Sequence, residues 1–402
     1  MTAAAAIAFL FSPPPAGEDL AGRFYIPRFS GGGMLVAGDA RSYLFYSGHL
    51  DRLLEKDSMR QSRPLYILAG EGCGLIIHHL LGKRVRYPYF WGYLALNFAL
   101  LDLSLVLIMK IFRLARVDLG LSLAAAPLLA FNNQTKNFIY TPHEQMLIIL
   151  TPLLAVYLTG KTLNKPGGLT LRDAVRLGLG VGVLGLAYGN FFLLGPCLLA
   201  AACLRLRTER RLSARGLLLP AAILLAAIAL PTLLWVGITT LTAGRYYNYE
   251  MAAFRQLVWV LDAARLGPKT LALVIAGNTG RFLETFADLD VALFPLLALA
   301  GIGVSRLRAH SAPPSDGAAQ EKEFRQAASI AIIVFLGFFW ILGYYQPRLT
   351  FSLAPPALIL IITDLNRLAA ASPRARAVAR AALAVGVAIW CPYHVFSYGP
   401  FY

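Results

Sequence analysis

The stretch YFWGYLALNFALLDLSLVLIMKI, residues 89–111, decides the fold class of this chain. It is long enough to cross a bilayer as a helix, because about 20 mostly apolar residues span the hydrocarbon layer. Its only charged residues are Asp102 and Lys110, and two arginines, Arg113 and Arg116, follow it. The stretch therefore predicts a membrane-spanning helix that ends in a basic loop.

The composition of the whole chain agrees with this prediction. Of its 402 residues, 57% are hydrophobic and 14% are charged, whereas soluble domains are about 45–50% apolar and about 25% charged. Similar apolar runs recur, and the turn AYGN (187–190) divides one of them into two short helices. The sequence predicts an all-α, polytopic membrane protein with about 10–11 transmembrane helices. The runs are 89–111, 119–131, 144–160, 176–203, 216–241, 289–306, 328–345, 349–366 and 380–395.

The distribution of lysine and arginine among the loops predicts the orientation of the chain. The basic loops are 110–118, 161–176, 204–215, 305–327 and 367–380. The intervening short loops contain only Lys136 and Arg348. Because cytoplasmic loops are rich in Lys and Arg, the first set is predicted to be cytoplasmic. Residues 1–88, the loop 242–288 and the C-terminal tail are then extracytoplasmic, and the Ala/Arg/Leu/Gly bias indicates a bacterial inner membrane.

These assignments divide the chain into four parts. Residues 1–88 form the N-terminal region and first outer loop, although residues 1–35 contain no 20-residue apolar run. Residues 64–82 are predicted to lie as a helix in the outer interface, because Glu71, His78 and His79 are costly at membrane depth. The other parts are a transmembrane core (89–306), a cytoplasmic linker (307–327) and the C-terminal transmembrane helices (328–402).

Several classes of protein are disfavoured by the sequence. The formal charge of +16 would suit nucleic acid, but the basic residues lie in short loops and no nucleic-acid-binding motif is present, so we expect no such partner. The cysteines have no CxxC spacing, and the adjacent His78 and His79 lack metal-site spacing. No motif supports a cofactor or a divalent metal.

Asp39 is the first candidate functional residue. It lies in VAGDARSYLFYSG (36–48), at the start of an amphipathic pattern that predicts a helix on the membrane surface. A carboxylate there could accept a proton from an incoming hydroxyl as a general base. The alternative is that Asp39 is an ordinary helix N-cap.

Two further candidate sites lie in predicted outer loops. His143 and Glu144 belong to TPHEQ (141–145) at the head of an apolar helix; they could point into one cavity, or Glu144 could simply favour the helix dipole. Arg348, in GYYQPRLTFSLAPPALILII (343–362), suits a phosphate, although an arginine at a helix end can also snorkel to the interface. Arg245, in GRYYNYE (244–250), lies beside tyrosines that could bind sugars or form an interfacial belt.

Together these stretches resemble the GT-C class of polytopic membrane glycosyltransferases, such as protein O-mannosyltransferases and the enzymes that add aminoarabinose to lipid A. The resemblance rests on an Asp in the first outer loop (GDARSYLFY), a following proline-containing helix (SRPLYILA), an acidic residue at a helix head (PHEQ) and a late motif (YYQPRLTFSLAPPALIL). Arg63 replaces the Lys or His that is usual before the proline. The likeness extends from about residue 36 to residue 366.

The resemblance implies a glycosyltransferase that uses a polyprenyl-phosphate sugar at the extracytoplasmic face and inverts the anomeric carbon. Its other partners would be membrane lipid and an acceptor hydroxyl on a glycan, lipid or protein. Asp39 would be the catalytic base. The implied substrate-binding residues are Arg348, Arg63, His143, Glu144, Arg245 and Tyr345.

Two alternatives remain open. An O-antigen-type polysaccharide ligase would favour several arginines and a histidine in one outer loop; the loop 242–288 contains four arginines but no histidine. A transporter or flippase of lipid-linked saccharides would favour charges at mid-membrane and two related halves, and the sequence shows few such charges and no clear internal similarity.

Overall fold

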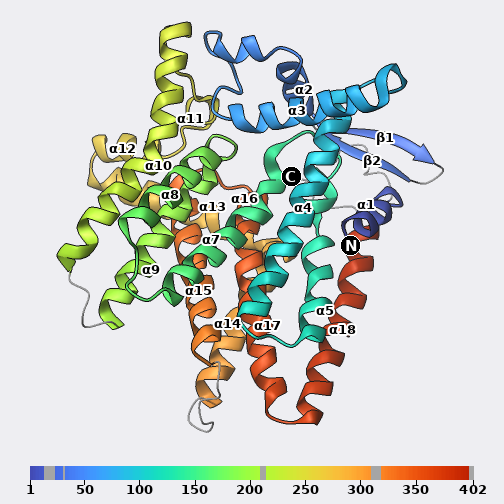
Figure 1. Cartoon of the computed structure of the whole chain (residues 1–402), viewed down its shortest axis with the longest axis vertical. Helices are drawn as coiled ribbons and strands as arrows, with labels where there is room; N and C mark the ends of the chain where they lie inside the picture. Colours follow the sequence, from blue (N-terminus) through green and yellow to red (C-terminus); the bar gives the residue numbers. More distant parts are fainter. Residues whose placement is uncertain (13–22, 30–31, 209–213, 309–317, 398–402) are drawn as a thin grey trace.

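The computed structural model describes residues 1–12, 23–29, 32–208, 214–308 and 318–397. Each predicted apolar run contains a helix of a long bundle (Figure 1), so the all-α, polytopic fold is confirmed. The helices that correspond to the predicted runs are α4 (Pro88–Leu114), α5 (Leu119–Ala130), α7 (Leu147–Asn164), α8 (Leu171–Gly185), α9 (Leu194–Thr208), α10 (Ala214–Ala243), α14 (Leu289–Arg308), α15 (Ala318–Leu342), α17 (Ala354–Ala370) and α18 (Pro373–Phe396).

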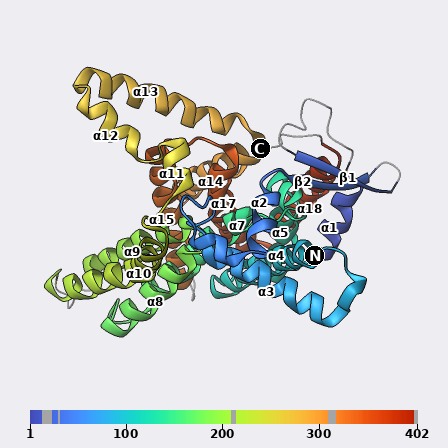
Figure 2. The same ribbon diagram turned by 90° about the horizontal axis from the view of Figure 1, so that it is seen from above.

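Eight helices in the described ranges are long and apolar enough to cross a membrane. One of these is α3 (Pro64–Leu81), which lies across the upper end of the bundle, crosswise to α4 (Figures 1 and 2). The length and composition of α3 would also suit a span, so the interfacial position of residues 64–82 stays a prediction. The predicted linker 307–327 is helical at both ends, because α14 continues to Arg308 and α15 begins at Ala318; residues 309–317 between them lie outside the described residues.

Contacts join the basic loops in pairs. Arg380 pairs with Asp118 (2.8 Å), which joins the loops 367–380 and 110–118. Arg205 donates to the carbonyl of Lys165 (3.2 Å) and thereby joins 204–215 to 161–176. The turn between α4 and α5 and the turn between α17 and α18 lie at the lower end of the bundle in Figure 1. The first loop and the segment 242–288 lie toward the opposite end.

The opposite end carries several short elements besides α3. They are α1 (Thr2–Leu10), β1 (Arg23–Phe29), β2 (Gly32–Ala37), α2 (Ala40–Ser47), the 3₁₀ turns Leu50–Leu54 and Glu144–Met146, α6 (Asn133–Phe138), α11 (Tyr249–Phe254), α12 (Val258–Arg265), α13 (Pro268–Glu284) and α16 (Pro347–Thr350). The antiparallel hairpin β1–β2 was not part of the sequence prediction. Its last residue, Ala37, donates its amide to Thr141 Oγ1 (3.2 Å), which brings Asp39 beside the loop 141–144.

The N-terminal helix α1 is too short to span a membrane. It packs against the bundle through buried Ala5, Ala6 and Phe9. Thr2 Oγ1 donates to Asp102 Oδ1 (2.5 Å), so the carboxylate in α4 has a polar partner. Asp102 therefore stabilises the attachment of α1 to α4.

Helices α3 and α4 cross at glycines. A Cβ atom on Gly92 would lie 2.4 Å from the amide nitrogen of Gly74 and 2.8 Å from the carbonyl oxygen of Gly70. Both obstacles are backbone atoms, which cannot rotate away as a side chain can. Small residues four apart on one helix are a common way for two membrane helices to approach this closely.

The substitution Gly92→Ala should therefore destabilise the protein by about 1–3 kcal/mol, the usual cost of forcing extra atoms into a packed interface. Gly72→Ala in α3 is the matched control, since a Cβ atom at that position would have no neighbouring atom within 4 Å. Thermal unfolding in detergent measures both. An equal melting temperature for the two variants would contradict the close approach of α3 and α4.

Candidate active site

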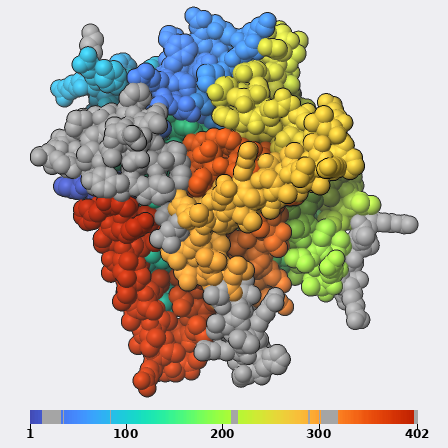
Figure 3. Space-filling view, turned by 180° about the vertical axis from the view of Figure 1, so that it is seen from behind, coloured from blue at the N-terminus to red at the C-terminus, as the bar shows by residue number. Residues whose placement is uncertain are grey.

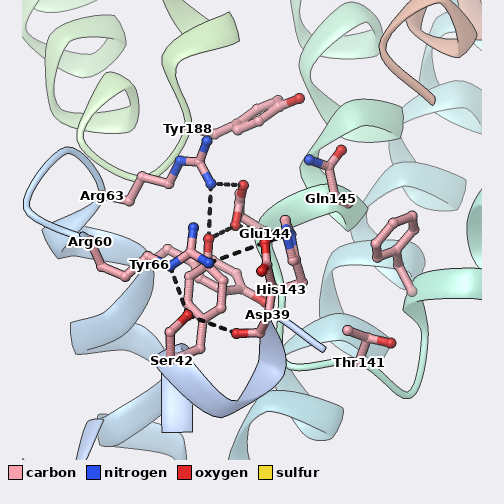
Figure 4. Close-up of polar contacts among 12 residues, drawn as sticks. Asp39, Ser42, Arg60, Arg63, Tyr66, Thr141, His143, Glu144, Gln145 and Tyr188 are labelled. Carbon is pink, nitrogen blue, oxygen red and sulfur yellow. Dashed lines mark hydrogen bonds and ion pairs between the residues drawn. The ribbon is translucent and has the colours of Figure 1, made fainter. Parts of the chain in front are cut away.

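Asp39 lies at the N-cap position of α2, but its carboxylate makes no capping hydrogen bond. Instead, Oδ2 lies 3.2 Å from Arg60 Nη2 and 3.5 Å from His143 Nε2 (Figure 4). The Asp39 side chain is 59% exposed, so one side of the carboxylate faces outward while the other contacts these two groups. The capping interpretation of this side chain is therefore wrong.

Arg60 forms an ion pair with Asp39 on the buried side of the carboxylate. It was not among the site residues predicted from the sequence. Its side chain is only 3% exposed. Its Nε donates to Ser42 Oγ (2.9 Å), and its guanidinium lies 4.3 Å from the ring centroid of Tyr43. The available signal was its position three residues before Arg63, in the same outer loop. A buried guanidinium needs a counter-charge, which Asp39 supplies.

Arg63 and Glu144 form a buried ion pair at the centre of the site. Arg63 Nη1 donates to Glu144 and to the hydroxyl of Tyr43 (2.9 Å), and its Nη2 lies 2.7 Å from Glu250 Oε1. Tyr43 in turn donates to the second oxygen of Glu144, whose side chain is fully buried. Arg63 therefore already has two carboxylate partners. Glu250, the second of them, was not among the site residues predicted from the sequence.

The electrostatics of the cluster keep Asp39 ionised. His143 lies between Asp39 and Glu144, with Nδ1 3.0 Å from Glu144 Oε2. The hydrogen bond from His143 is the largest cause that holds the pKa of Asp39 well below its usual range; Arg60 adds to it, and burial opposes both. The outward-facing carboxylate is therefore a permanent negative charge at neutral pH.

The pH dependence gives a test of this arrangement. Because the folded-state pKa of Asp39 is depressed, its ionised form contributes stability above its unfolded pKa of about 3.9 and loses it as pH falls toward the folded value. Removing one cation with Arg60→Gln should raise that pKa, so that activity begins to fall at a higher pH. We expect kcat to drop about tenfold.

The measurement is a pH profile of kcat and KM from pH 8 down to about pH 2, below the ordinary aspartate pKa, for the wild type, Arg60→Gln and Arg60→Lys. If Arg60 positions Asp39, the pH at which kcat falls on acidification should rise in Arg60→Gln and return partly toward the wild-type value in Arg60→Lys. The same pH in Arg60→Gln as in the wild type would show that Arg60 does not act on Asp39.

The backbone that presents His143 is fixed by Asn97 in α4. Asn97 Nδ2 donates to the carbonyl of Thr141 (2.7 Å) and to that of Phe138 (3.0 Å), while its Oδ1 accepts from the hydroxyl of Tyr66 (3.1 Å). These carbonyls lie in a buried loop, where an unsatisfied acceptor is costly. Asn97 therefore positions the loop that leads into His143.

Arg348 lies in a second group of residues, at the start of α16. Its Nη2 donates to the hydroxyl of Tyr344 (3.1 Å), and its Nε is buried without a hydrogen-bond partner. Within the described ranges no carboxylate pairs with it. Burial raises the pKa of Tyr188, Glu144 adds to that rise, and Arg63 and Arg348 oppose it. Tyr188 therefore lies close enough to feel the charges of the Arg63–Glu144 pair and of Arg348.

Asp39, Arg60, Arg63, His143 and Glu144 are here called the Asp39 cluster. Tyr345 and Arg245 lie outside it. Tyr345 lines a cavity of about 460 Å³ next to α13, and its hydroxyl donates to the carbonyl of Trp340 (2.8 Å). Arg245 makes two hydrogen bonds to Asp57 (2.8 and 2.6 Å) at an exposed position. Arg245 thus ties the loop 242–288 to the first loop, and Glu250 is the residue of that loop that reaches Arg63.

The structure therefore brings Asp39, Arg63, His143 and Glu144 together and places Arg348 and Tyr345 in a neighbouring group. In the part of the chain that the structure describes, no three His, Cys, Asp or Glu side chains are arranged to hold a metal ion.

Comparison with solved structures finds a similar fold. The sequence matches no protein-family model and no curated protein sequence. The fold is similar to the crystal structure of ArnT from Cupriavidus metallidurans bound to undecaprenyl phosphate, with a TM-score of 0.51 and 16% sequence identity. The match covers 96% of this chain and 62% of that chain, so this chain spans less than two thirds of the ArnT chain. The protein thus has a GT-C-like membrane fold.

Proposed function

We propose that the protein is a membrane glycosyltransferase that moves a sugar from a polyprenyl-phosphate donor to an acceptor hydroxyl, with inversion, at the extracytoplasmic face. The observation that carries the proposal is Asp39, a half-exposed carboxylate held by a buried arginine and a histidine at one end of a membrane bundle. The fold likeness to a structure that contains undecaprenyl phosphate supports a lipid-linked donor.

Asp39 is the base in this proposal. The acceptor oxygen attacks the anomeric carbon while the bond from that carbon to the phosphate oxygen breaks. The hydroxyl proton passes to Asp39, and the lipid phosphate leaves with the bonding electrons. A single displacement of this kind inverts the anomeric centre. An anionic donor bound nearby offsets the charge of Arg60 and so raises the pKa of Asp39 toward the working range.

Arg348 is the arginine best suited to the donor phosphate. Arg63 is shared by two carboxylates, and Arg245 is engaged by Asp57. Arg348 has no carboxylate partner among the described residues and keeps a buried Nε without a hydrogen bond. A guanidinium with unused donors can stabilise the negative charge that develops on a leaving phosphate.

The proposed side of the membrane follows from the basic loops. Asp39 immediately precedes α2, which lies at the end of the bundle opposite the turn between α17 and α18 (Figure 1); the arginine-rich loops, of which that turn is one, are expected to be cytoplasmic. Nucleotide sugars are cytoplasmic metabolites, so a site on the outer face needs a donor that reaches it through the bilayer. A multi-pass protein of a bacterial inner membrane would fit these requirements.

Sugar transfer in proteoliposomes tests the proposal. The purified protein is supplied with radiolabelled polyprenyl-monophosphate sugars and with glycan, lipid or protein acceptors from a bacterial envelope. The proposal expects transfer from a lipid monophosphate and none from nucleotide sugars. Transfer only from a diphosphate-linked chain would favour the ligase, and movement of the lipid-linked sugar across the bilayer without transfer would favour the flippase.

A further inference from the structure

A cavity of about 460 Å³ lies between the end of α13 and the segment that joins α15 to α16. Figure 3 shows α13, in yellow-orange, crossing this face of the molecule below the N-terminal region. The volume lies within the range of small-molecule sites, about 300–1,000 Å³. The lining residues used below are Arg281, Glu284, Tyr344 and Tyr345.

The cavity offers both hydrogen-bond donors and acceptors. The Tyr344 hydroxyl accepts from Arg348, so its own proton is available to a ligand. The Tyr345 hydroxyl donates to Trp340, so its lone pairs are available. Arg281 adds further donors and Glu284 adds acceptors. Neighbouring hydroxyl groups of a saccharide require such a mixture, because each of them donates and accepts.

The charges of the lining cancel. Arg281 and Glu284 lie three residues apart on one face of α13, and neither forms an ion pair with another side chain in the described ranges. An anionic ligand would meet Glu284, and a cationic ligand would meet Arg281. An uncharged polyhydroxyl ligand meets neither repulsion and can use both groups as hydrogen-bond partners.

We propose that this cavity binds a neutral saccharide rather than an acidic or an amino sugar. The assignment of that saccharide as a substrate rests on the proposed function; the binding itself does not. Both the sugar of the lipid-linked donor and the end of an acceptor glycan have this chemistry.

The short helix α11 connects the cavity with the Asp39 cluster. Glu250, near its start, pairs with Arg63 and accepts from Ser62 Oγ (3.1 Å). Phe254, at its end, packs on Tyr344 with ring centroids 4.5 Å apart. Because Tyr344 also accepts from Arg348, a saccharide in the cavity lies beside the group proposed to hold the donor phosphate.

Saturation-transfer NMR on the whole protein in nanodiscs tests the binding directly. The probes are methyl glucoside and methyl mannoside (neutral), glucuronate (anionic) and glucosamine (cationic). The wild type should bind the neutral glycosides at least about tenfold more tightly than the charged sugars, the factor expected for one unfavourable charge contact. Tryptophan fluorescence gives a second readout, because Trp259 packs against Gly343 of the lining.

Charge-neutral variants make the test specific. Glu284→Gln should admit glucuronate, Arg281→Gln should admit glucosamine, and both should retain thermal stability because the two side chains are exposed. Arg265→Gln, also exposed and on the neighbouring helix α12, is the matched control and should leave the preference unchanged. No binding of neutral sugars, or the same charge preference in all variants, would overturn the inference.

Competition identifies the source of the saccharide. If the cavity holds the donor sugar, a polyprenyl-phosphate sugar displaces the free glycoside and polyprenyl phosphate alone does not. If it holds the acceptor, saturating donor leaves the glycoside bound. Charge-selective sugar binding without any sugar transfer would support the saccharide site and contradict the proposed function. Failure of the binding proposal can therefore be told apart from failure of the proposed function.

Discussion

Replacing Asp39 by asparagine is expected to lower kcat for sugar transfer by about 10²–10⁴-fold, the range that a positioned general base contributes. Asparagine has nearly the same shape, but it cannot take the proton from the acceptor hydroxyl. The exposed position of the carboxylate means that the substitution removes little buried packing, so the fold should be retained. Initial rates at saturating donor and acceptor separate the loss in kcat from any change in KM.

The matched control is Asp51→Asn, an exposed aspartate in the same outer loop. It should keep the wild-type rate, and both variants should unfold at temperatures close to that of the wild type. A wild-type rate in folded Asp39→Asn would remove this residue from the chemistry. Loss of activity together with early unfolding would instead assign it to stability.

The substitution Arg63→Met is expected to cost about 3–5 kcal/mol of stability, the usual penalty for breaking a buried ion pair. It leaves Glu144 fully buried with a negative charge and removes a donor from Tyr43. The double variant Arg63→Met with Glu144→Gln should recover a large part of the loss, because no unpaired buried carboxylate then remains at position 144.

Equilibrium unfolding in mixed micelles measures these differences. Arg245→Met is the comparison, since its pair with Asp57 is exposed and such pairs contribute at most about 1 kcal/mol. If Arg63→Met were as stable as Arg245→Met, the central pair would not stabilise the fold. Arg63 would then be better explained as a ligand for substrate.

The sequence predicted the membrane helices well because their physical requirement is local. A helix in lipid needs about 20 apolar residues, and the arginine counts of the loops follow directly from the sequence. The glycine crossing of α3 and α4 was not predicted, since it depends on which faces of two helices meet. Residues 89–111 alone do not specify that Gly92 contacts Gly74.

The candidate site was predicted in part. Asp39, Arg63, His143 and Glu144 were selected because polar residues in predicted outer loops are expected to gather at one end, and the structure places them in contact. Their roles in catalysis remain predictions.

Arg60 and Glu250 were not selected. The role of Arg60 could not be predicted from the sequence, because its burial depends on how residues 58–63 fold against Asp39. Glu250 lies 187 positions from Arg63 in the chain, and only the return of the loop 242–288 brings the two together. Contacts of such long range are not encoded in a local pattern.

The separation of Glu250 from its partners in the chain also has a consequence for biosynthesis. Asp39, Arg60, Arg63 and Glu144 all emerge from the ribosome before α7, and Glu250 follows only after α7, α8, α9 and α10 have been made. The nascent chain can therefore pair Arg63 with Glu144 while the later helices are still being inserted. Neither charge then remains unpaired in the membrane interface during insertion. The contact with Glu250 closes the cluster afterwards, and a nascent chain arrested before residue 250 should already protect Arg63 from solvent.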